Sequence, residues 1–256
     1  MIVAIHQPNL FPRLKVLQKL ALADLWVVLD DVQFNRRDYQ QRSWVQPTDP
    51  MNPAQWCSLP VTLPQRRRTP IRDVVVSAPA AWATFRRKVD FLYAAHPVVR
   101  RLLDSAEAGV APPGTSGAST TMDEAIEHEL PRLSGIAISS TTALLAEAGV
   151  APHVVLASTL RDTVEPKSSG ILQILAAVGA TTYLADSGAR GYLRSSDVTR
   201  TGCSLMWQRW CPDPRVELAD QVQRNGTALN VVTRHAALFP ELVRGSTVTR
   251  LMEECS

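Results

Sequence analysis

The sequence predicts an α/β fold: a mostly parallel, Rossmann-like sheet flanked by helices, with additional helical segments. The chain opens on an apolar run, Ile2–Ile5, of the kind that forms a strand buried on both faces. A helix-like segment and a second apolar run follow, so strand, helix and strand occupy about 30 residues, as in a βαβ unit. The same alternation returns in the second half of the chain, which is typical of an open α/β sheet.

The first unit predicts where ligands bind. From Leu14 to Ala23 the leucines fall mostly on one helical face, and the run "LWVVLDD" then reads as a strand that ends at Asp30 and Asp31. Two strands joined by one helix are parallel, so their carboxyl ends meet at the same edge of the sheet. We therefore expect His6, Asp30 and Asp31 to lie together at the edge where open α/β sheets bind their ligands.

The remaining elements continue this alternation as a single domain spanning residues 1–256. Further strands are expected at Gln55–Val61, 71–77, 153–159 and the start of 181–193. Helices are expected at Trp82–His96, Asp123–Leu133, Ser140–Ala148 and 168–180. The stretch at 108–120 is rich in Gly, Pro and Ser and is expected to be a flexible loop.

Composition excludes several classes of protein. The net charge of +3 is too small to predict nucleic-acid binding, and no apolar run is long enough for a membrane-spanning helix. The first residues lack the pattern of a signal peptide, so a cytoplasmic location is expected. The 4 cysteines form no CxxC pair and no zinc-site spacing, so neither a disulfide scaffold nor a metal site is predicted.

Four ordered motifs resemble the WbqC-like protein family. They are "HQPNLFP", "LDDVQFNRR", "QWCSLPV" and "GATTYLADSGARGYL", and together they extend to about residue 195. The segment from about residue 200 departs from the family pattern, because "ALNVVTRHAALF" stands where family members have a Leu- and Ser-rich segment. What the family's C-terminal segment does is therefore not transferred to this chain.

The resemblance implies an enzyme of sugar-conjugate or antibiotic biosynthesis. A narrower similarity, to the condensing enzymes of lincosamide antibiotics, implies an acyltransferase that forms an amide. Such an enzyme takes an aminoacyl group from a peptidyl carrier protein and joins it to the amine of an amino sugar. The phosphopantetheine arm of the carrier is then the expected cofactor, and no bound cofactor is expected.

Cys57 and His6 are the residues expected to carry this chemistry. A thiol beside an imidazole is partly ionised near neutral pH and attacks thioesters, as in cysteine proteases. If the Gln55–Val61 strand lies beside the first two strands, Cys57 comes close to His6. The alternative interpretations are that Cys57 is a small buried apolar residue and that His6 is a core histidine bonded to a backbone carbonyl.

A carboxylate is expected to orient the imidazole, with Asp30, Asp31 and Glu165 as the candidates. Glu165 also fits an ordinary surface loop. Gln7 is expected to donate a hydrogen bond to an oxyanion, by analogy with papain-like sites. The sequence does not rank these carboxylates.

Polar residues at the same predicted edge are expected to bind the substrate. They are Gln7, Asp30, Gln33, Asn35, Arg37, Ser187 and Tyr192. Arg36 and the run Arg66, Arg67 and Arg68 are expected to dock an acidic carrier protein or its phosphopantetheine phosphate, although such a run also fits a solvated loop.

Two other functions remain open from the sequence. One is a nucleotide-dependent transferase, because a histidine at the tip of the first strand of a Rossmann-like fold is found in nucleotidyl transferases. No Gly-rich phosphate signature supports it. The other is a non-catalytic scaffold that binds a carrier protein or a sugar.

Overall fold

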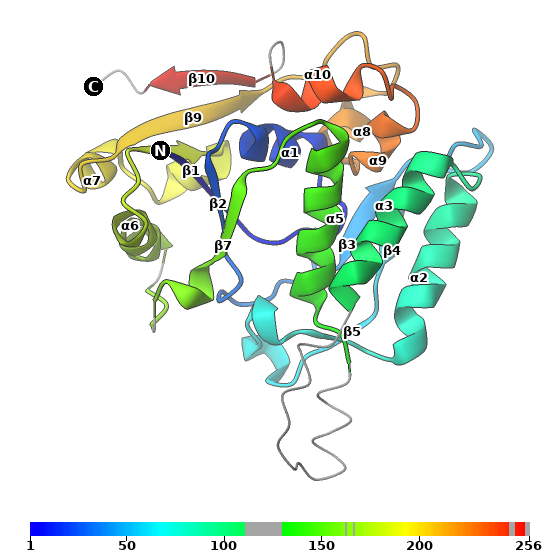
Figure 1. Cartoon of the computed structure of the whole chain (residues 1–256), viewed down its shortest axis with the longest axis horizontal. Helices are drawn as coiled ribbons and strands as arrows, with labels where there is room; N and C mark the ends of the chain where they lie inside the picture. Colours follow the sequence, from blue (N-terminus) through cyan, green and yellow to red (C-terminus); the bar gives the residue numbers. More distant parts are fainter. Residues whose placement is uncertain (111–129, 162, 166, 246–248, 254–256) are drawn as a thin grey trace.

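The centre of the molecule is a sheet with the strand order β10-β9-β8-β1-β2-β7 (Figure 1). The computed structural model describes residues 1–110, 130–161, 163–165, 167–245 and 249–253. The strands of this sheet are β1 (Ile2–His6), β2 (Leu25–Val28), β7 (His153–Leu156), β8 (Thr182–Ala185), β9 (Ser204–Trp210) and β10 (Thr249–Glu253). All neighbours pair in parallel except β10, which runs antiparallel to β9. The predicted α/β fold is confirmed.

Helices cover both faces of this sheet. Helices α1 (Leu14–Ala21) and α5 (Leu133–Glu147) pack on one face, and α6 (Lys167–Ala177) and α7 (Ser195–Thr199) pack on the other (Figure 1). Within β1, Ala4 contributes to the first of these two cores, whereas its neighbours on either side contribute to the second. The first strand is therefore buried on both faces, as its apolar sequence predicts.

A second group of elements packs outside α1 and α5. It contains the helices α2 (Pro79–Leu92), α3 (Pro97–Glu107), α8 (Asp220–Asn225), α9 (Leu229–Val232) and α10 (Phe239–Arg244), and the 3-10 turns η1 (Arg66–Arg68), η2 (Ile71–Asp73) and η3 (Ala108–Val110). Two small antiparallel sheets complete this group: β3 (Arg42–Val45) with β4 (Gln55–Ser58), and β5 (Val61–Thr62) with β6 (Val75–Val76). The turns η4 (Ala157–Thr159) and η5 (Ser187–Gly191) follow β7 and β8 and contribute Ala157 and Ala189 to the core on the α6 side of the main sheet.

The prediction that the Gln55–Val61 strand joins the main sheet is wrong. The segment is interrupted at Pro60, which has no N–H to donate to a ladder, and its two halves pair with different partners. The segment 71–77 is mostly not a strand either. It begins as the turn η2, whose Ile71 N–H bonds to the Val32 carbonyl, and only Val75–Val76 form β6.

Several helix boundaries also differ from the predicted ones. Helix α2 covers most of the predicted Trp82–His96 segment, and α5 begins seven residues before the predicted Ser140, at Leu133. Helix α3 was not predicted. Most of the expected loop at 108–120 and of the expected helix at Asp123–Leu133 lies outside the described residues.

The order of the strands creates a switch point between β1 and β8. From β1 the chain passes to β2 and then β7 on one side, and α6 carries it back to β8 on the other side of β1. The helices that leave the carboxyl ends of β1 and β8 therefore diverge to opposite faces. In open α/β sheets the crevice at such a point is where ligands bind.

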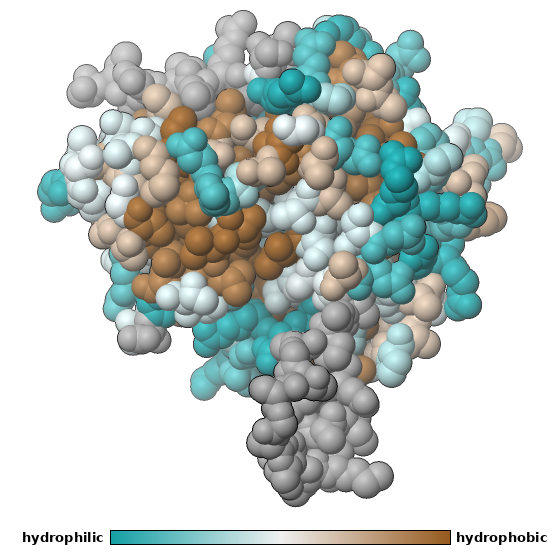
Figure 2. All heavy atoms as spheres, in the orientation of Figure 1, coloured by the Kyte–Doolittle hydropathy of each residue, from teal (hydrophilic) through white to brown (hydrophobic). Residues whose placement is uncertain are grey.

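The molecular surface carries both polar and apolar regions. Figure 2 shows apolar side chains gathered in the region of α6 and the edge strand β7, where Val154 is 37% exposed. Among the described residues, no helix has the length and the apolar character needed to span a membrane.

Candidate functional site

His6 and Asp186 face each other across the switch point. His6 is the last residue of β1, and its backbone carbonyl accepts hydrogen bonds from the Leu29 N–H at 2.9 Å and the Trp26 indole at 3.3 Å. Asp186 directly follows β8 and caps η5 by accepting the Gly188 N–H at 2.9 Å. Its Oδ2 lies 4.0 Å from Nδ1 of His6. The carboxylate nearest to His6 therefore comes from β8 and not from β2.

Lys19 of α1 joins these two residues. Its side chain is only 2% exposed, and its Nζ donates to the Ile5 carbonyl at 3.0 Å and to Oδ2 of Asp186 at 3.4 Å. The same Nζ lies 3.5 Å from Nδ1 of His6. An ammonium group can only donate a hydrogen bond, so Nδ1 of His6 accepts from it with a lone pair.

The opposite ring nitrogen of His6 is then the protonated one. Its Nε2 lies 3.0 Å from Oδ1 of Asn9, which accepts its hydrogen. Lys19 and Asn9 thus fix one neutral tautomer of the imidazole, with a hydrogen on Nε2 and a lone pair on Nδ1.

Burial and the Lys19 charge lower the pKa of His6 to about 3, while the Asp186 carboxylate opposes the shift. Burial also lowers the pKa of Lys19, against the attraction of Asp186. The pKa of Asp186 is lowered as well, chiefly by the charge of Lys19. At neutral pH the site is therefore a neutral imidazole beside an ammonium–carboxylate pair.

Replacing Lys19 by methionine is expected to raise the pKa of His6. The change removes the positive charge that disfavours the imidazolium, while burial continues to lower the pKa and the Asp186 carboxylate continues to raise it. We expect a rise of about 1 to 2 units, followed by NMR titration of the His6 ring protons. The control is Lys15→Met on the same helix, which should leave the pKa of His6 unchanged. An equal His6 pKa in wild type and Lys19→Met would contradict this electrostatic account.

A cavity of about 330 Å³ opens beside His6. Its walls come from the β1–α1 segment, the end of β2, α6 and η5. They include Ile5, His6, Gln7, Asn9, Arg13, Leu29, Asp38, Ile171, Tyr183, Asp186, Gly188, Ala189 and Tyr192. Three residues predicted for the site, His6, Gln7 and Tyr192, thus share one cavity. Its size suits a small polar molecule or the end of an extended arm.

Gln7 is positioned by a chain of amides. Its Oε1 accepts from Nε2 of Gln40 at 2.8 Å, and Oε1 of Gln40 accepts the Asn35 N–H at 2.9 Å. Because its oxygen is occupied, the Gln7 side chain keeps its NH₂ group as a donor, and no described residue accepts from it. This is the chemistry that was predicted for an oxyanion contact.

The comparison with protein families identifies the chain. A family model described as the WbqC-like protein family matches residues 7–216. The chain belongs to the WbqC-like protein family. The matched residues begin directly after His6 and run past β9, so they reach beyond the end of the predicted motifs near residue 195. No curated protein and no solved structure matches the chain.

The carboxylates of Asp30 and Asp31 form hydrogen bonds with residues other than His6. Oδ1 and Oδ2 of Asp30 accept from the Ser158 N–H at 3.0 Å and its hydroxyl at 2.7 Å. Asp31 forms a fully buried, bidentate pair with Arg161, at 2.7 and 2.9 Å. Arg161 in turn donates to the Gly170 carbonyl at 2.9 Å. These two carboxylates hold β2, η4 and α6 together, and the structure does not bring them to the His6 ring.

Glu165 lies in the exposed segment before α6, and it does not line the His6 cavity. The structure therefore brings none of the predicted orienting carboxylates next to the imidazole. That position is occupied by Asp186.

Cys57 is completely buried in β4, opposite Ser43 of β3. It packs in the core that includes Val45, Trp82 and Tyr93, and burial raises the pKa of its thiol. The main influence against that shift is the charge of Lys88 of α2. The structure thus places Cys57 in a sheet separate from β1, and it does not line the cavity beside His6.

The predicted arginine positions come together in space. The Phe34 N–H bonds to the Thr69 carbonyl at 3.0 Å, and the Gln33 side chain donates to the Arg67 carbonyl. The segment of Arg36 and Arg37 therefore lies beside η1, and all these arginines are exposed. We call the exposed side chains of Arg36, Arg37 and Arg66–Arg68 the arginine surface; it lies beyond the carboxyl end of β2.

Sequence reasoning missed Lys19, Asn9 and Asp186. A lysine that falls on the apolar face of a helix was a usable signal for Lys19, because a buried ammonium group requires partners. Asp186 follows a predicted strand directly, but its role depends on β8 lying beside β1, and strand order is not visible in local sequence. Asn9 follows a Pro in the "HQPN" motif and carried no separate signal.

Proposed function

We propose that the chain is a cytoplasmic acyltransferase that forms an amide from an aminoacyl carrier-protein thioester and the amine of an amino sugar, in antibiotic biosynthesis of the lincosamide type or in making a sugar conjugate. Membership of the WbqC-like family supports an enzyme of this kind. The observation that carries the proposal is the neutral, fixed tautomer of His6 beside Lys19 and Asp186 at the mouth of a cavity.

The pKa of His6 assigns its role. A group with a pKa of about 3 is a weak base at neutral pH, so we assign His6 as a hydrogen-bond donor rather than as a general base. Its Nε2–H, now held by Asn9, would stabilise the oxygen of the thioester carbonyl as negative charge develops on it. Gln7 would supply a second donor from the same cavity wall.

Asp186 would attract the amine. Its side chain is 41% exposed and its lowered pKa keeps it ionised, so it presents a carboxylate to a cationic amino group. The ammonium group first releases one proton to solvent. The neutral amine nitrogen then attacks the thioester carbon, a C–N bond forms and the C–S bond breaks. The second proton lost by the nitrogen ends on the released carrier thiolate. The reaction is balanced without ATP.

We propose direct transfer because Cys57 is buried. A route through a Cys57 thioester requires the thiol to leave the core formed by β4 and α2 and to ionise against the effect of burial. That route stays a prediction from the sequence, and intact-protein mass spectrometry with an aminoacyl carrier protein separates it from direct transfer.

The proposal is tested with purified components. The protein is incubated with an aminoacyl carrier protein and an amino sugar without nucleotide, and the amide and the free carrier thiol are quantified. Amide formation in equal amount with the free thiol is expected. Product that appears only with ATP favours a nucleotide-dependent transferase, and binding of carrier or sugar without any product favours a scaffold.

The arginine surface is proposed to dock the acidic carrier protein. Replacing Arg66, Arg67 and Arg68 together by glutamate should weaken carrier binding about 10-fold at low salt and flatten its salt dependence, because exposed charges mainly guide association. Binding is measured by surface plasmon resonance over a salt series, with Arg87→Glu of α2 as a control. Unchanged affinity and salt dependence in the triple variant would exclude this surface.

A further inference from the structure

A second cavity, of about 310 Å³, lies beside the first and shares Asp186 with it. It forms under the part of β9 that extends beyond the end of β8, because β8 stops at Ala185, paired with Trp207, while β9 continues to Trp210. Its residues are Lys15, Asp186, Ser187, Arg190, Trp207, Gln208, Arg209, Trp210 and Arg224. None of the roles proposed above uses its cations.

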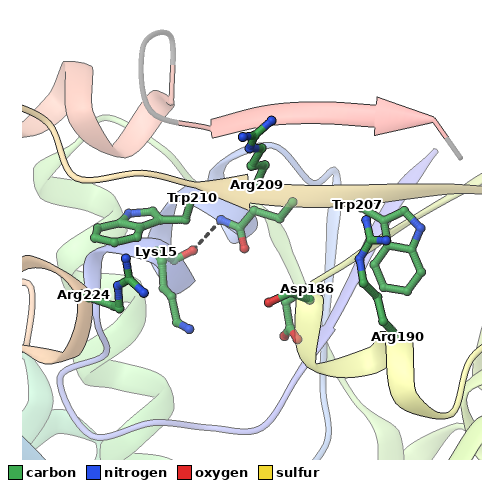
Figure 3. Close-up of a pocket in the computed structure, with 9 residues that line it drawn as sticks. Lys15, Asp186, Arg190, Trp207, Arg209, Trp210 and Arg224 are labelled. Atoms are coloured by element: carbon green, nitrogen blue, oxygen red, sulfur yellow. Dashed lines mark hydrogen bonds between the residues drawn. The ribbon is translucent and has the colours of Figure 1, made fainter. Parts of the chain in front are cut away.

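Positive charge dominates this cavity. Figure 3 shows Lys15 and Arg224 on one side of Asp186 and Arg190 on the other, all on the same side of β9. Asp186 is the carboxylate among its lining residues, and it is already bonded to Lys19. In the described part of the chain, Lys15, Arg190 and Arg224 form no ion pair and their side chains donate no hydrogen bond to the protein.

Indole rings hold two of these cations in place. The guanidinium of Arg190 lies 4.5 Å from the ring centre of Trp207, and that of Arg224 lies 5.8 Å from the ring centre of Trp210. A guanidinium that lies over an indole keeps its in-plane N–H donors available. The indole rings therefore orient the N–H donors of both guanidinium groups and leave these donors available for a ligand.

Lys15 adds charge where a helix already favours anions. It lies in the first turn of α1, which contains no acidic residue. The positive end of the helix dipole favours an anion at this place and disfavours a cation. Burial and the nearby charges of Arg13, Lys19 and Arg224 lower the pKa of Lys15, against the effect of Asp186. An anion bound here would relieve this repulsion.

We infer that this cavity binds the phosphate group of a substrate whose reacting end lies beside His6. Three donor-bearing cations without protein acceptors match the several oxygens and the double charge of a phosphate ester. The inference rests on the proposed function only in naming the two sources of that phosphate. They are the phosphopantetheine arm of the carrier and a phosphorylated amino sugar.

The inference is tested by calorimetric titration, which does not depend on turnover. The probes are 4′-phosphopantetheine against pantetheine, and glucosamine 1-phosphate against glucosamine. The phosphorylated member of at least one pair should bind more than about 10-fold tighter, and the pair identifies the source. Arg190→Gln and Arg224→Gln should each weaken binding of the phosphorylated probe about 10-fold, as expected for loss of a charge-assisted hydrogen bond.

The control is Arg200→Gln, because Arg200 is exposed and paired with Asp197 outside this cavity. It should leave phosphate affinity unchanged. Equal binding of phosphorylated and unphosphorylated probes, or equal losses in Arg200→Gln and Arg224→Gln, would overturn the inference. Phosphate binding without amide formation would instead overturn the proposed acyl transfer and leave this site in place.

Discussion

Replacing His6 by alanine lowers kcat for amide formation by about 10²- to 10³-fold, the usual cost of losing one preorganised oxyanion donor. His6→Gln retains an N–H donor of similar reach, so it should recover part of the lost rate. A glutamine side chain cannot act as a base, and the two variants would be equally inactive if His6 removed a proton from the amine. Rapid-quench kinetics with a saturating amino sugar measure the chemical step.

The pH dependence supplies an independent check of the His6 role. Since the imidazole is neutral above a pKa of about 3, its protonation should not contribute an inflection near pH 6.5 to the wild-type rate. A rate that falls below pH 6.5 in wild type but not in His6→Gln would contradict the donor role.

The second large effect concerns stability and not catalysis. Arg161→Met leaves the Asp31 carboxylate buried without its partner, and we expect a loss of about 3 to 5 kcal/mol in the free energy of unfolding. Urea denaturation at pH 7 measures it. The double variant Asp31→Leu/Arg161→Met should recover most of this loss, because both buried charges are then removed together.

Conservative substitutions of Asp31 and Glu165 test the prediction that one of these carboxylates orients the His6 imidazole. Asp31→Asn should lower stability while the folded fraction keeps its kcat, and Glu165→Gln should change neither quantity by much, since Glu165 is exposed. A large loss of kcat without a loss of stability in either variant would place that carboxylate in the catalytic machinery after all.

Local sequence was sufficient to predict the first βαβ unit and the edge of the sheet where His6 lies. Apolar runs and helical periodicity depend on neighbouring residues, and these determine the parallel pairing of β1 with β2. The position of His6 at the carboxyl edge follows from that pairing alone. Gln7 and Tyr192, which lie within two of the recognised motifs, also line the cavity beside His6.

The remainder of the site depends on which distant strands become neighbours. Asp30 and Asp31 end the strand on one side of β1, and Asp186 ends the strand on the other side; only the strand order decides which carboxylate faces His6. Cys57 shows the same limit. The Gln55–Val61 sequence predicts a strand, but it does not reveal that β4 pairs with β3 and turns the Cys57 thiol into the core.

Intact-protein mass spectrometry in the presence of an aminoacyl carrier protein, without an amine acceptor, tests the central claim most directly. Direct transfer at His6 predicts that the protein keeps its unmodified mass, and that Cys57→Ala forms the amide near the wild-type rate once the amino sugar is added. An acyl adduct on wild type that is absent from Cys57→Ala, together with loss of product in that variant, would contradict direct transfer and make Cys57 the nucleophile.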